Sequence, residues 1–227
     1  MQNPTDNLFD TSTQENLFKT SPLSARMRPR SLEEYIGQKH VLGEGMLLPR
    51  AIASDRLSSL ILYGPPGVGK TTLAHCISLK TQSNFERINA VTSNVEEMRK
   101  IIASAQNRRR TSGRKTTLFI DEIHRFNKAQ QDVLMPDLED GNIVLIGATV
   151  FNPFFALISP LLSRSIVVEL KPLSVSDIKQ ILKRALEDRE RGLGLFNIQA
   201  DDDAIDFLAE ASNGDGRKAL NASEIVS

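Results

Sequence analysis

The sequence predicts an α/β fold in which a mostly parallel five-stranded sheet is covered by helices on both faces. Three observations support this prediction. Five short apolar runs alternate with stretches that have helical spacing, which is typical of parallel sheets. A glycine-rich loop follows the first run, and beyond Pro172 the pattern becomes entirely helical. The predicted strands span residues 60–63, 85–88, 117–120, 143–146 and 166–170.

The glycine-rich loop fits the phosphate-binding pattern G-x-x-x-x-G-K-[ST]. Glycines let the backbone fold around an anion with its N–H groups pointing inward, and the positive end of the next helix, expected over residues 72–79, lies beneath the phosphates. Lys70 can reach the β and γ oxygens of ATP, and the Thr71 hydroxyl can ligate Mg²⁺. An ordinary glycine-rich turn is the alternative, which the flanking strand and helix disfavour. The predicted nucleotide-binding residues here are Gly64, Pro65, Pro66, Gly67, Val68, Gly69, Lys70, Thr71 and Thr72.

Two carboxylates follow the strand predicted at 117–120, and they indicate hydrolysis. Asp121 is suited to hold Mg²⁺ directly or through water, and Glu122 to orient and polarise the attacking water. Acidic pairs after strands are common. A pair about fifty residues after a phosphate loop is a much stronger indication. We therefore expect Thr71 and Asp121 as metal ligands, and Glu122 and Lys70 as catalytic residues.

Composition excludes little but sets the context. Lysine plus arginine and aspartate plus glutamate balance at 28 each, so no overall charge indicates a nucleic-acid or membrane partner. The single cysteine, Cys76, cannot form an internal disulfide, and its expected role is burial as a small apolar residue. The N-terminus lacks a signal-peptide layout, and no apolar run approaches membrane-spanning length. These features predict a soluble cytoplasmic protein with no membrane partner.

The chain is expected to divide into three parts. Residues 1–21 are polar and predict a disordered tail, residues 22–171 the nucleotide-binding domain, and residues 172–227 a small helical domain. The last predicted helix begins after Gly216 and is cut at Ser227, so we expect the helical domain to be incomplete.

Further helices are expected between the strands. Ser31 and Glu34 form a capping-box pattern for a short helix, and helices are also predicted at 46–54, 95–105, 127–138, 177–190 and 204–211. The basic segment 108–115 is predicted to be a loop. It is either a solvated connection or a patch that contacts nucleic-acid phosphates.

Taken together and in this order, these residues resemble the AAA+ ATPases of the clamp-loader clade. The sequence is especially similar to the family of replication-associated recombination protein A (MgsA) and the Werner-helicase-interacting protein. The resemblance covers the chain from about residue 22 to the end. It rests on segments 22–29, 36–40, 89–94, 119–128, 147–149, 161–164 and 214–221.

The resemblance implies a P-loop AAA+ sheet of order 5-1-4-3-2, followed by a helical lid with ATP bound between them. It implies a homo-oligomer that acts on single-stranded or forked DNA at stalled forks, gaps or ends, with DNA-stimulated ATPase activity and association with the nucleoid. Arg164 matches an arginine finger acting in trans, for which a surface salt bridge is the alternative. Arg217 matches the sensor-2 arginine, and Asn89 the position that couples partner binding to the catalytic glutamate. The segment beside the adenine is matched by Arg28, Pro29, Ile36 and Gly37.

One departure from the family pattern affects the expected chemistry. Val150 stands where the family usually has the sensor-1 hydroxyl, and valine cannot hydrogen-bond the γ-phosphate or water. Thr149 could substitute only if the end of the strand shifts. The resemblance therefore implies slower hydrolysis than is usual for the family.

Two other classes of function remain open. A protein-remodelling AAA+ chaperone would need an aromatic pore loop, and no convincing one is visible. A structural subunit that binds nucleotide with little turnover is kept open by Val150.

The tail carries a possible docking peptide. Gln14–Phe18 resembles the Q-x-x-L-F peptide that docks on the sliding clamp: Leu17 and Phe18 could fill an apolar pocket, while Gln14 satisfies its polar rim. A plain disordered leader is the alternative.

Overall fold

The structure is a computed structural model that describes residues 21–57 and 59–225. The chain forms two compact units. One spans residues 29–172, and the other joins the residues up to Arg28 to those from Leu173 onward. The segment just after residue 21 thus belongs with the helical unit, whereas the sequence placed it with the nucleotide-binding domain. The peptide Gln14–Phe18 lies outside the described residues.

The first unit is built on a sheet of five parallel strands. Their order is β2-β3-β4-β1-β5, which confirms the expected order 5-1-4-3-2. Because all strands run the same way, their carboxyl ends meet at one edge of the sheet, where α/β folds bind ligands. The strands are β1 (Ser59–Tyr63), β2 (Asn84–Asn89), β3 (Thr116–Asp121), β4 (Ile143–Thr149) and β5 (Ile166–Glu169).

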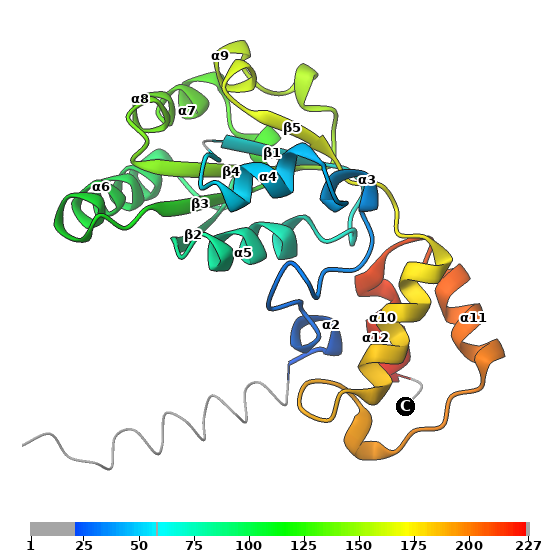
Figure 1. Cartoon of the computed structure of the whole chain (residues 1–227). Helices are drawn as coiled ribbons and strands as arrows, with labels where there is room; N and C mark the ends of the chain where they lie inside the picture. The colour runs from blue at the N-terminus through cyan, green and yellow to red at the C-terminus, as the bar shows by residue number, and fades with distance from the viewer. Residues whose placement is uncertain (1–20, 58, 226–227) are drawn as a thin grey trace, which may run out of the picture. The chain divides into compact units, whose positions relative to one another are not determined.

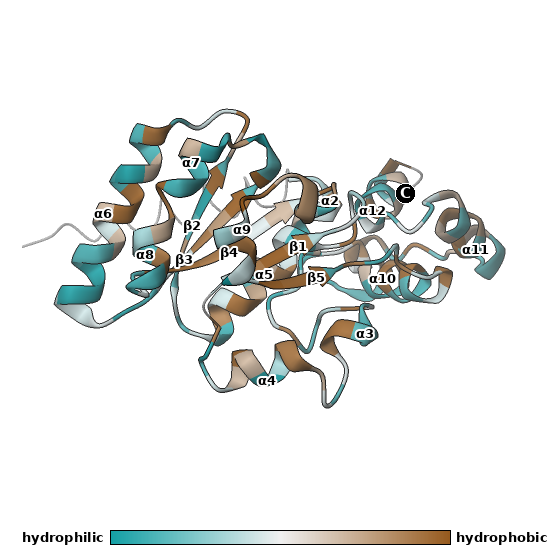
Figure 2. Cartoon of the chain, turned by 90° about the horizontal axis from the view of Figure 1, so that it is seen from above, coloured by the Kyte–Doolittle hydropathy of each residue, from teal (hydrophilic) through white to brown (hydrophobic). Residues whose placement is uncertain are grey.

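Alternate side chains of the strands enter two separate cores. On β1, Ile61 joins one cluster, whereas Leu60 and Leu62 join the other. The helices α6 to α9 lie over the first core, and α3 to α5 over the second (Figure 1). The central strands β1, β3 and β4 are mostly apolar, while the outer faces of the helices are polar (Figure 2). The helices are α3 (Lys39–Leu42), α4 (Leu47–Ala53), α5 (Lys70–Lys80), α6 (Val95–Ser112), α7 (Lys128–Asp132), α8 (Met135–Glu139) and α9 (Ser159–Ser163).

The basic segment 108–115 differs from the expected loop, because most of it continues helix α6. The Asn94 side chain caps the start of α6 by accepting from the Glu97 N–H at 2.9 Å, and Gly113 ends the helix in a left-handed conformation. Arg108 pairs with Glu86 at 3.3 Å and donates to the Thr116 hydroxyl at 2.8 Å. This arginine therefore holds α6 against the sheet.

Two other helix predictions need correction. The helix expected at 127–138 is divided into α7 and α8, and Pro136 lies in the first turn of α8, where a missing N–H is tolerated. Ser31 accepts from the Glu34 N–H at 3.4 Å, but only a turn forms there. Gly37 and Gln38 both have positive φ soon afterwards, so too few residues remain to nucleate a helix.

In the second unit, the described residues form four α-helices that pack around two small apolar clusters. Ser174 and Asp177 form a capping box at the start of α10. The start of α2 is fixed by Glu224, which accepts from the Leu23 N–H at 2.8 Å and pairs with Arg26 at 2.7 Å. These contacts explain why residues 23–28 belong to this unit. Its helices are α2 (Leu23–Arg26), α10 (Val175–Glu187), α11 (Asp202–Ala211) and α12 (Gly216–Ile225).

Three short 3₁₀ helices complete the described structure: η1 (Ile123–Arg125), η2 (Pro153–Phe155) and η3 (Gly194–Phe196). Within the described ranges, no helix is both long and apolar enough to cross a bilayer.

Candidate nucleotide-binding and hydrolysis site

The phosphate loop connects β1 to α5 at the carboxyl edge of the sheet, as its motif predicts. Gly64 has φ 146° and Gly69 has φ 97°, conformations that L side chains rarely adopt. Space is restricted as well. A Cβ at Gly64 would collide with the carbonyl oxygen of Leu170, and one at Gly69 with the hydroxyl of Tyr35. Backbone geometry and packing therefore both require glycine here.

Lys70 is the first residue of α5, and its ammonium group lies against its own loop. Its Nζ donates to the carbonyl oxygens of Gly64 at 2.8 Å and Pro65 at 2.7 Å. Thr71 and Thr72 follow in the first turn and are half-buried. The N-terminal N–H groups of an 11-residue helix favour an anion at this position.

Tyr35 fixes the segment before β1 to the phosphate loop, a contact that the sequence analysis missed. Its hydroxyl donates to the Val68 carbonyl oxygen at 3.0 Å. Burial, with a smaller contribution from Cys76, raises the pKa of Tyr35 far above its usual value, so the hydroxyl stays a donor. The Gln38 side chain exchanges two hydrogen bonds with the Lys171 backbone, at 2.7 and 3.0 Å. These contacts hold the expected adenine-side residues Pro29, Ile36 and Gly37 within this unit.

Cys76 is buried as predicted. Its thiol lies 3.4 Å from the Ser31 carbonyl oxygen, beneath the same segment. Burial, followed by the charges of Glu34 and Glu33, raises the pKa of Cys76 to about 11. The thiol is therefore protonated at neutral pH and packs as an apolar group.

Asp121 and Glu122 lie where β3 reaches the same edge of the sheet. Asp121 Oδ2 pairs with Arg87 of β2 at 2.8 Å, and Arg87 was not among the predicted site residues. Glu122 has φ 58°, so the backbone turns sharply from the strand into η1. Glu122 Oε2 lies 3.4 Å from His124 Nε2 and 4.0 Å from Arg125 Nε.

The oxygen atoms of Thr71 and Asp121 are of the kind that Mg²⁺ prefers as ligands. Thr71 and Asp121 are oxygen donors from two elements that meet at the carboxyl edge, and Mg²⁺ in nucleotide sites takes most other ligands from phosphates and water. Among the described residues there is no cluster of three or more His, Cys, Asp or Glu that could hold a metal by itself. The residues fit a metal ion that arrives with its nucleotide.

Thr149 is the last residue of β4, and its hydroxyl already contacts His124, which follows the Asp121–Glu122 turn. Its Oγ1 lies 2.9 Å from His124 Nδ1 and accepts from the Phe151 N–H at 3.1 Å. The side chain is 1% exposed, whereas Val150 is 38% exposed and has no hydroxyl. In this structure the Thr149 hydroxyl is thus bonded to groups of the protein itself.

Asn89 reaches the same edge, directly opposite Asp121 in the β2–β3 register. Its side-chain oxygen accepts from the Val91 N–H at 2.9 Å, and the residue is exposed. Within the described residues, no hydrogen bond joins Asn89 to Glu122. The structure therefore places Asn89 near the expected partner without a direct contact.

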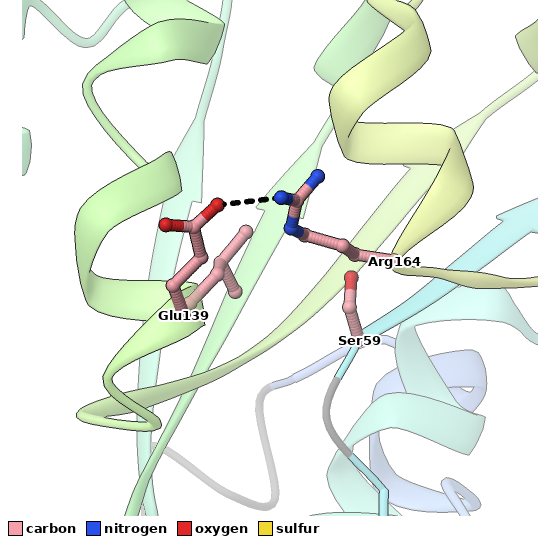
Figure 3. A pocket seen from close by; sticks show the side chains of 4 residues that line it. Ser59, Glu139 and Arg164 are labelled. Atoms are coloured by element: carbon pink, nitrogen blue, oxygen red, sulfur yellow. Dashed lines mark ion pairs between the residues drawn. The ribbon is translucent and has the colours of Figure 1, made fainter.

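Arg164 lies at the opposite edge of the sheet, at the amino ends of β1 and β5. It follows α9, pairs with Glu139 at 2.7 Å and donates to the Pro160 carbonyl oxygen at 3.1 Å (Figure 3). Its side chain is 46% exposed. Ser59 lies beside it, where β1 begins. A cavity of about 360 Å³ lies here, and it is lined by Ser59, Leu138, Glu139 and Arg164.

Arg28 and Arg217 belong to the helical unit, whereas the phosphate loop and the Asp121–Glu122 turn belong to the unit of residues 29–172. Arg217 is exposed in the first turn of α12. The carboxylate of Asp215 accepts from the Lys218 N–H at 2.9 Å and caps this turn.

A protein-family model matches more than half of the chain. Residues 27–152 match the model of the Holliday junction DNA helicase RuvB P-loop domain. A solved structure of the Thermotoga maritima RuvB Holliday junction branch migration motor superposes with a TM-score of 0.70 at 33% identity, covering 88% of this chain and 64% of that one.

Curated relatives share the sequence more closely. Replication-associated recombination protein A of Escherichia coli K12 is 52% identical over 93% of this chain, and that of Bacillus subtilis 44% over 90%. The ATPase WRNIP1 of Dictyostelium discoideum is 44% identical over 91% of this chain and 23% of its own length. The chain spans about half the length of the bacterial relatives, 47% and 48% respectively. The chain therefore belongs to the family of AAA+ proteins that carry the RuvB P-loop domain, and it resembles replication-associated recombination protein A.

Proposed function

We propose that this chain binds ATP with Mg²⁺ and hydrolyses it, as part of a protein that acts on DNA in replication-associated recombination and repair. One observation carries the proposal. The phosphate loop and the Asp121–Glu122 turn come together at the carboxyl edge of one parallel sheet, where β4 lies between β1 and β3. The names of the curated relatives and of the RuvB structure support a role in recombination.

In the proposed reaction, the N–H groups of the loop and of the first turn of α5 bind the phosphates. The Lys70 ammonium leaves the Gly64 and Pro65 carbonyl oxygens and turns to the β and γ oxygens. Thr71 and Asp121 would hold Mg²⁺, which neutralises charge that develops on the phosphates. Glu122 orients and polarises the attacking water.

The proposed arginine finger is Arg164, acting on the nucleotide of a neighbouring subunit in a homo-oligomer. Arg164 and the phosphate loop lie at opposite ends of the five-residue strand β1. At about 3.3 Å per residue the strand is longer than an arginine side chain can reach, so Arg164 is unsuited to act on its own loop. The surface salt bridge to Glu139 is therefore compatible with a finger that exchanges Glu139 for a neighbour's phosphate.

The proposal also includes a DNA partner, single-stranded or forked, that stimulates the ATPase. The proposed location is cytoplasmic and associated with the nucleoid.

A protein-remodelling function is the second candidate, and one observation favours it. Three aromatic side chains near the end of β4 are exposed: Phe151 at 58%, Phe154 at 64% and Phe155 at 90%. The structural-subunit alternative depends on Val150 alone, and the retained Lys70, Asp121 and Glu122 disfavour it.

One experiment separates these functions. The ATPase rate of full-length protein is measured with single-stranded, duplex and forked DNA, and with an unfolded polypeptide as the competing stimulant. We expect stimulation by DNA. Stimulation by the polypeptide but not by DNA would favour the remodelling function. If the protein binds ATP but does not hydrolyse it with any of these additions, the structural-subunit function would be favoured. Two variants serve as controls: Lys70→Ala should abolish ATP binding, whereas Glu122→Gln should keep binding and stop turnover.

Docking on a sliding clamp through Gln14–Phe18 is a separate proposal, because this peptide lies outside the described residues. A synthetic peptide of residues 10–20 should bind purified clamp with micromolar affinity, because the burial of Leu17 and Phe18 is offset by the ordering of the tail. The doubly substituted peptide, Leu17→Ala and Phe18→Ala, should not bind. Equal binding by both peptides, or by neither, would contradict clamp docking.

A further inference from the structure

His124 lies between the proposed base and the end of β4, and its ring is almost fully enclosed. Its side chain is 7% exposed, and Phe151 packs edge-on against the ring at 4.8 Å between centroids. Nδ1 is 2.9 Å from Thr149 Oγ1. Nε2 is buried without a hydrogen-bond partner among the described residues, and Glu122 Oε2 is 3.4 Å away.

The groups around the ring, Thr149 on one side and Glu122 on the other, indicate which ring nitrogen carries the proton. The Phe151 N–H donates to Thr149 Oγ1 at 3.1 Å, so the hydroxyl accepts there and has one proton of its own to donate. The two possible acceptors are His124 Nδ1 at 2.9 Å and the Phe151 carbonyl oxygen at 3.4 Å. The hydroxyl can donate to Nδ1, or it can accept from Nδ1 and donate to the Phe151 carbonyl oxygen. The Glu122 carboxylate, 3.4 Å from Nε2, favours the first arrangement because it can only accept, so we assign the hydrogen of the neutral ring to Nε2. Burial also lowers the pKa of His124, although the charge of Glu122 opposes this effect. The lowered pKa favours the neutral ring.

The group without a hydrogen bond is therefore a buried N–H donor that lies 3.4 Å from Glu122 Oε2. We propose that His124 is a positioning residue that holds the Glu122 carboxylate through Nε2–H, and that Thr149 fixes the tautomer required for this bond. A movement of a few tenths of an ångström brings the pair to ordinary hydrogen-bond length. The inference rests on the proposed role of Glu122 as the base.

This assignment explains a contrast at the end of β4. Val150 lacks the hydroxyl usual at its position, whereas the neighbouring Thr149 keeps a hydroxyl that is buried and bonded to His124. Thr149 thus acts on the base through the imidazole. Arg125 approaches Glu122 from a more exposed position, at 4.0 Å and 62% exposed, and holds the carboxylate more loosely than a buried donor does.

Two amide substitutions test the inference, because each keeps one half of the ring's hydrogen bonding. In His124→Gln the side-chain N–H can take the place of Nε2–H, whereas in His124→Asn the amide can take only the place of Nδ1. We expect His124→Gln in full-length protein to keep ATP turnover within about threefold of wild type. His124→Asn should lose about ten- to a hundredfold, as is typical when an orienting partner is removed. ATP affinity, measured with a fluorescent analogue, should stay within about twofold for both.

Two further measurements keep the outcomes distinct. Thr149→Val should also lower turnover, and combining it with His124→Asn should add little, because both act through one hydrogen-bonded chain. Equal turnover by the Gln and Asn variants, with Glu122→Gln inactive, would overturn the positioning role alone. Normal turnover by Glu122→Gln would instead overturn the proposed base, and this inference with it. A thermal melt of each variant verifies that the compared proteins are folded.

Discussion

The two ends of strand β1 are built on different principles. At its carboxyl end, backbone groups set the phosphate loop: glycines with positive φ pack against Leu170 and Tyr35, and Lys70 bonds to loop carbonyls. At its amino end, side chains dominate. Arg164 and Glu139 form a half-exposed ion pair beside a cavity of about 360 Å³. The first end is fixed whether or not a partner is present, whereas the second can exchange one partner for another.

The largest expected effect breaks the fixed end through its backbone. Gly64→Ala should destabilise the protein by more than about 3 kcal/mol, because positive-φ strain and a collision with the Leu170 carbonyl add together. Gly45→Ala is the matched control, since Gly45 has φ 80° but open space around a Cβ, and it should cost about 1–2 kcal/mol. Urea denaturation measures both. If the two variants lose the same free energy of unfolding, backbone strain alone explains why the loop requires glycine, and the collision with Leu170 contributes nothing.

The second effect breaks the exchangeable end. Arg164→Ala should leave ATP binding unchanged but lower the turnover of full-length protein by about 10³-fold or more, as is typical for arginine fingers. Mixing Arg164→Ala with Lys70→Ala subunits should partly restore turnover, because each supplies what the other lacks. No recovery in oligomers shown to be mixed would contradict a role in trans.

The third effect concerns the carboxyl end of β4, which lies beside the carboxyl end of β1. Val150→Thr should raise turnover by up to about a hundredfold, since it supplies a transition-state hydrogen bond of the kind worth about 3 kcal/mol. ATP affinity should hardly change. Because the Thr149 hydroxyl is already bonded to His124, we expect that it leaves this role open. An unchanged rate in steady-state assays would show that another group does.

The smallest effect concerns the contact that Arg164 exchanges. Glu139→Gln removes the charge that holds Arg164, and an exposed ion pair is worth about 0.2–1 kcal/mol. Turnover at limiting subunit concentration should therefore rise by no more than about fivefold. Glu96→Gln, which breaks an exposed pair with Lys100 on α6, is the matched control and should change nothing. A fall in turnover with Glu139→Gln would mean that Glu139 orients Arg164 and does not compete for it.

Much of the fold was predictable because its signals are local. Apolar runs and a motif of fixed spacing gave the parallel sheet, the phosphate loop and the Asp121–Glu122 turn, and the family resemblance gave the strand order. Both ends of α6 were also encoded, the start by Asn94 and the end by Gly113, but the high charge of the segment 108–115 favoured the prediction of a loop.

The parts that were missed depend on contacts between distant positions. Tyr35 meets Val68 across 33 residues, and Arg87 meets Asp121 across 34. Leu23 meets Glu224 across 201 residues, which places the start of the described chain with the helical unit. Such pairs follow from how the elements pack, and no periodicity or spacing in the sequence indicates them.

The left-handed backbone at Glu122 lowers the stability of the fold, whereas the Glu122 side chain is needed for the proposed activity. A residue with a Cβ held at φ 58° costs about 1–2 kcal/mol relative to glycine. Glu122→Gly should therefore make the protein more resistant to unfolding while it removes the proposed base. A library selected only for heat tolerance would enrich glycine at this position, and its most stable members would bind ATP without turning it over. Thermal resistance is thus a misleading guide when improved variants of this protein are sought.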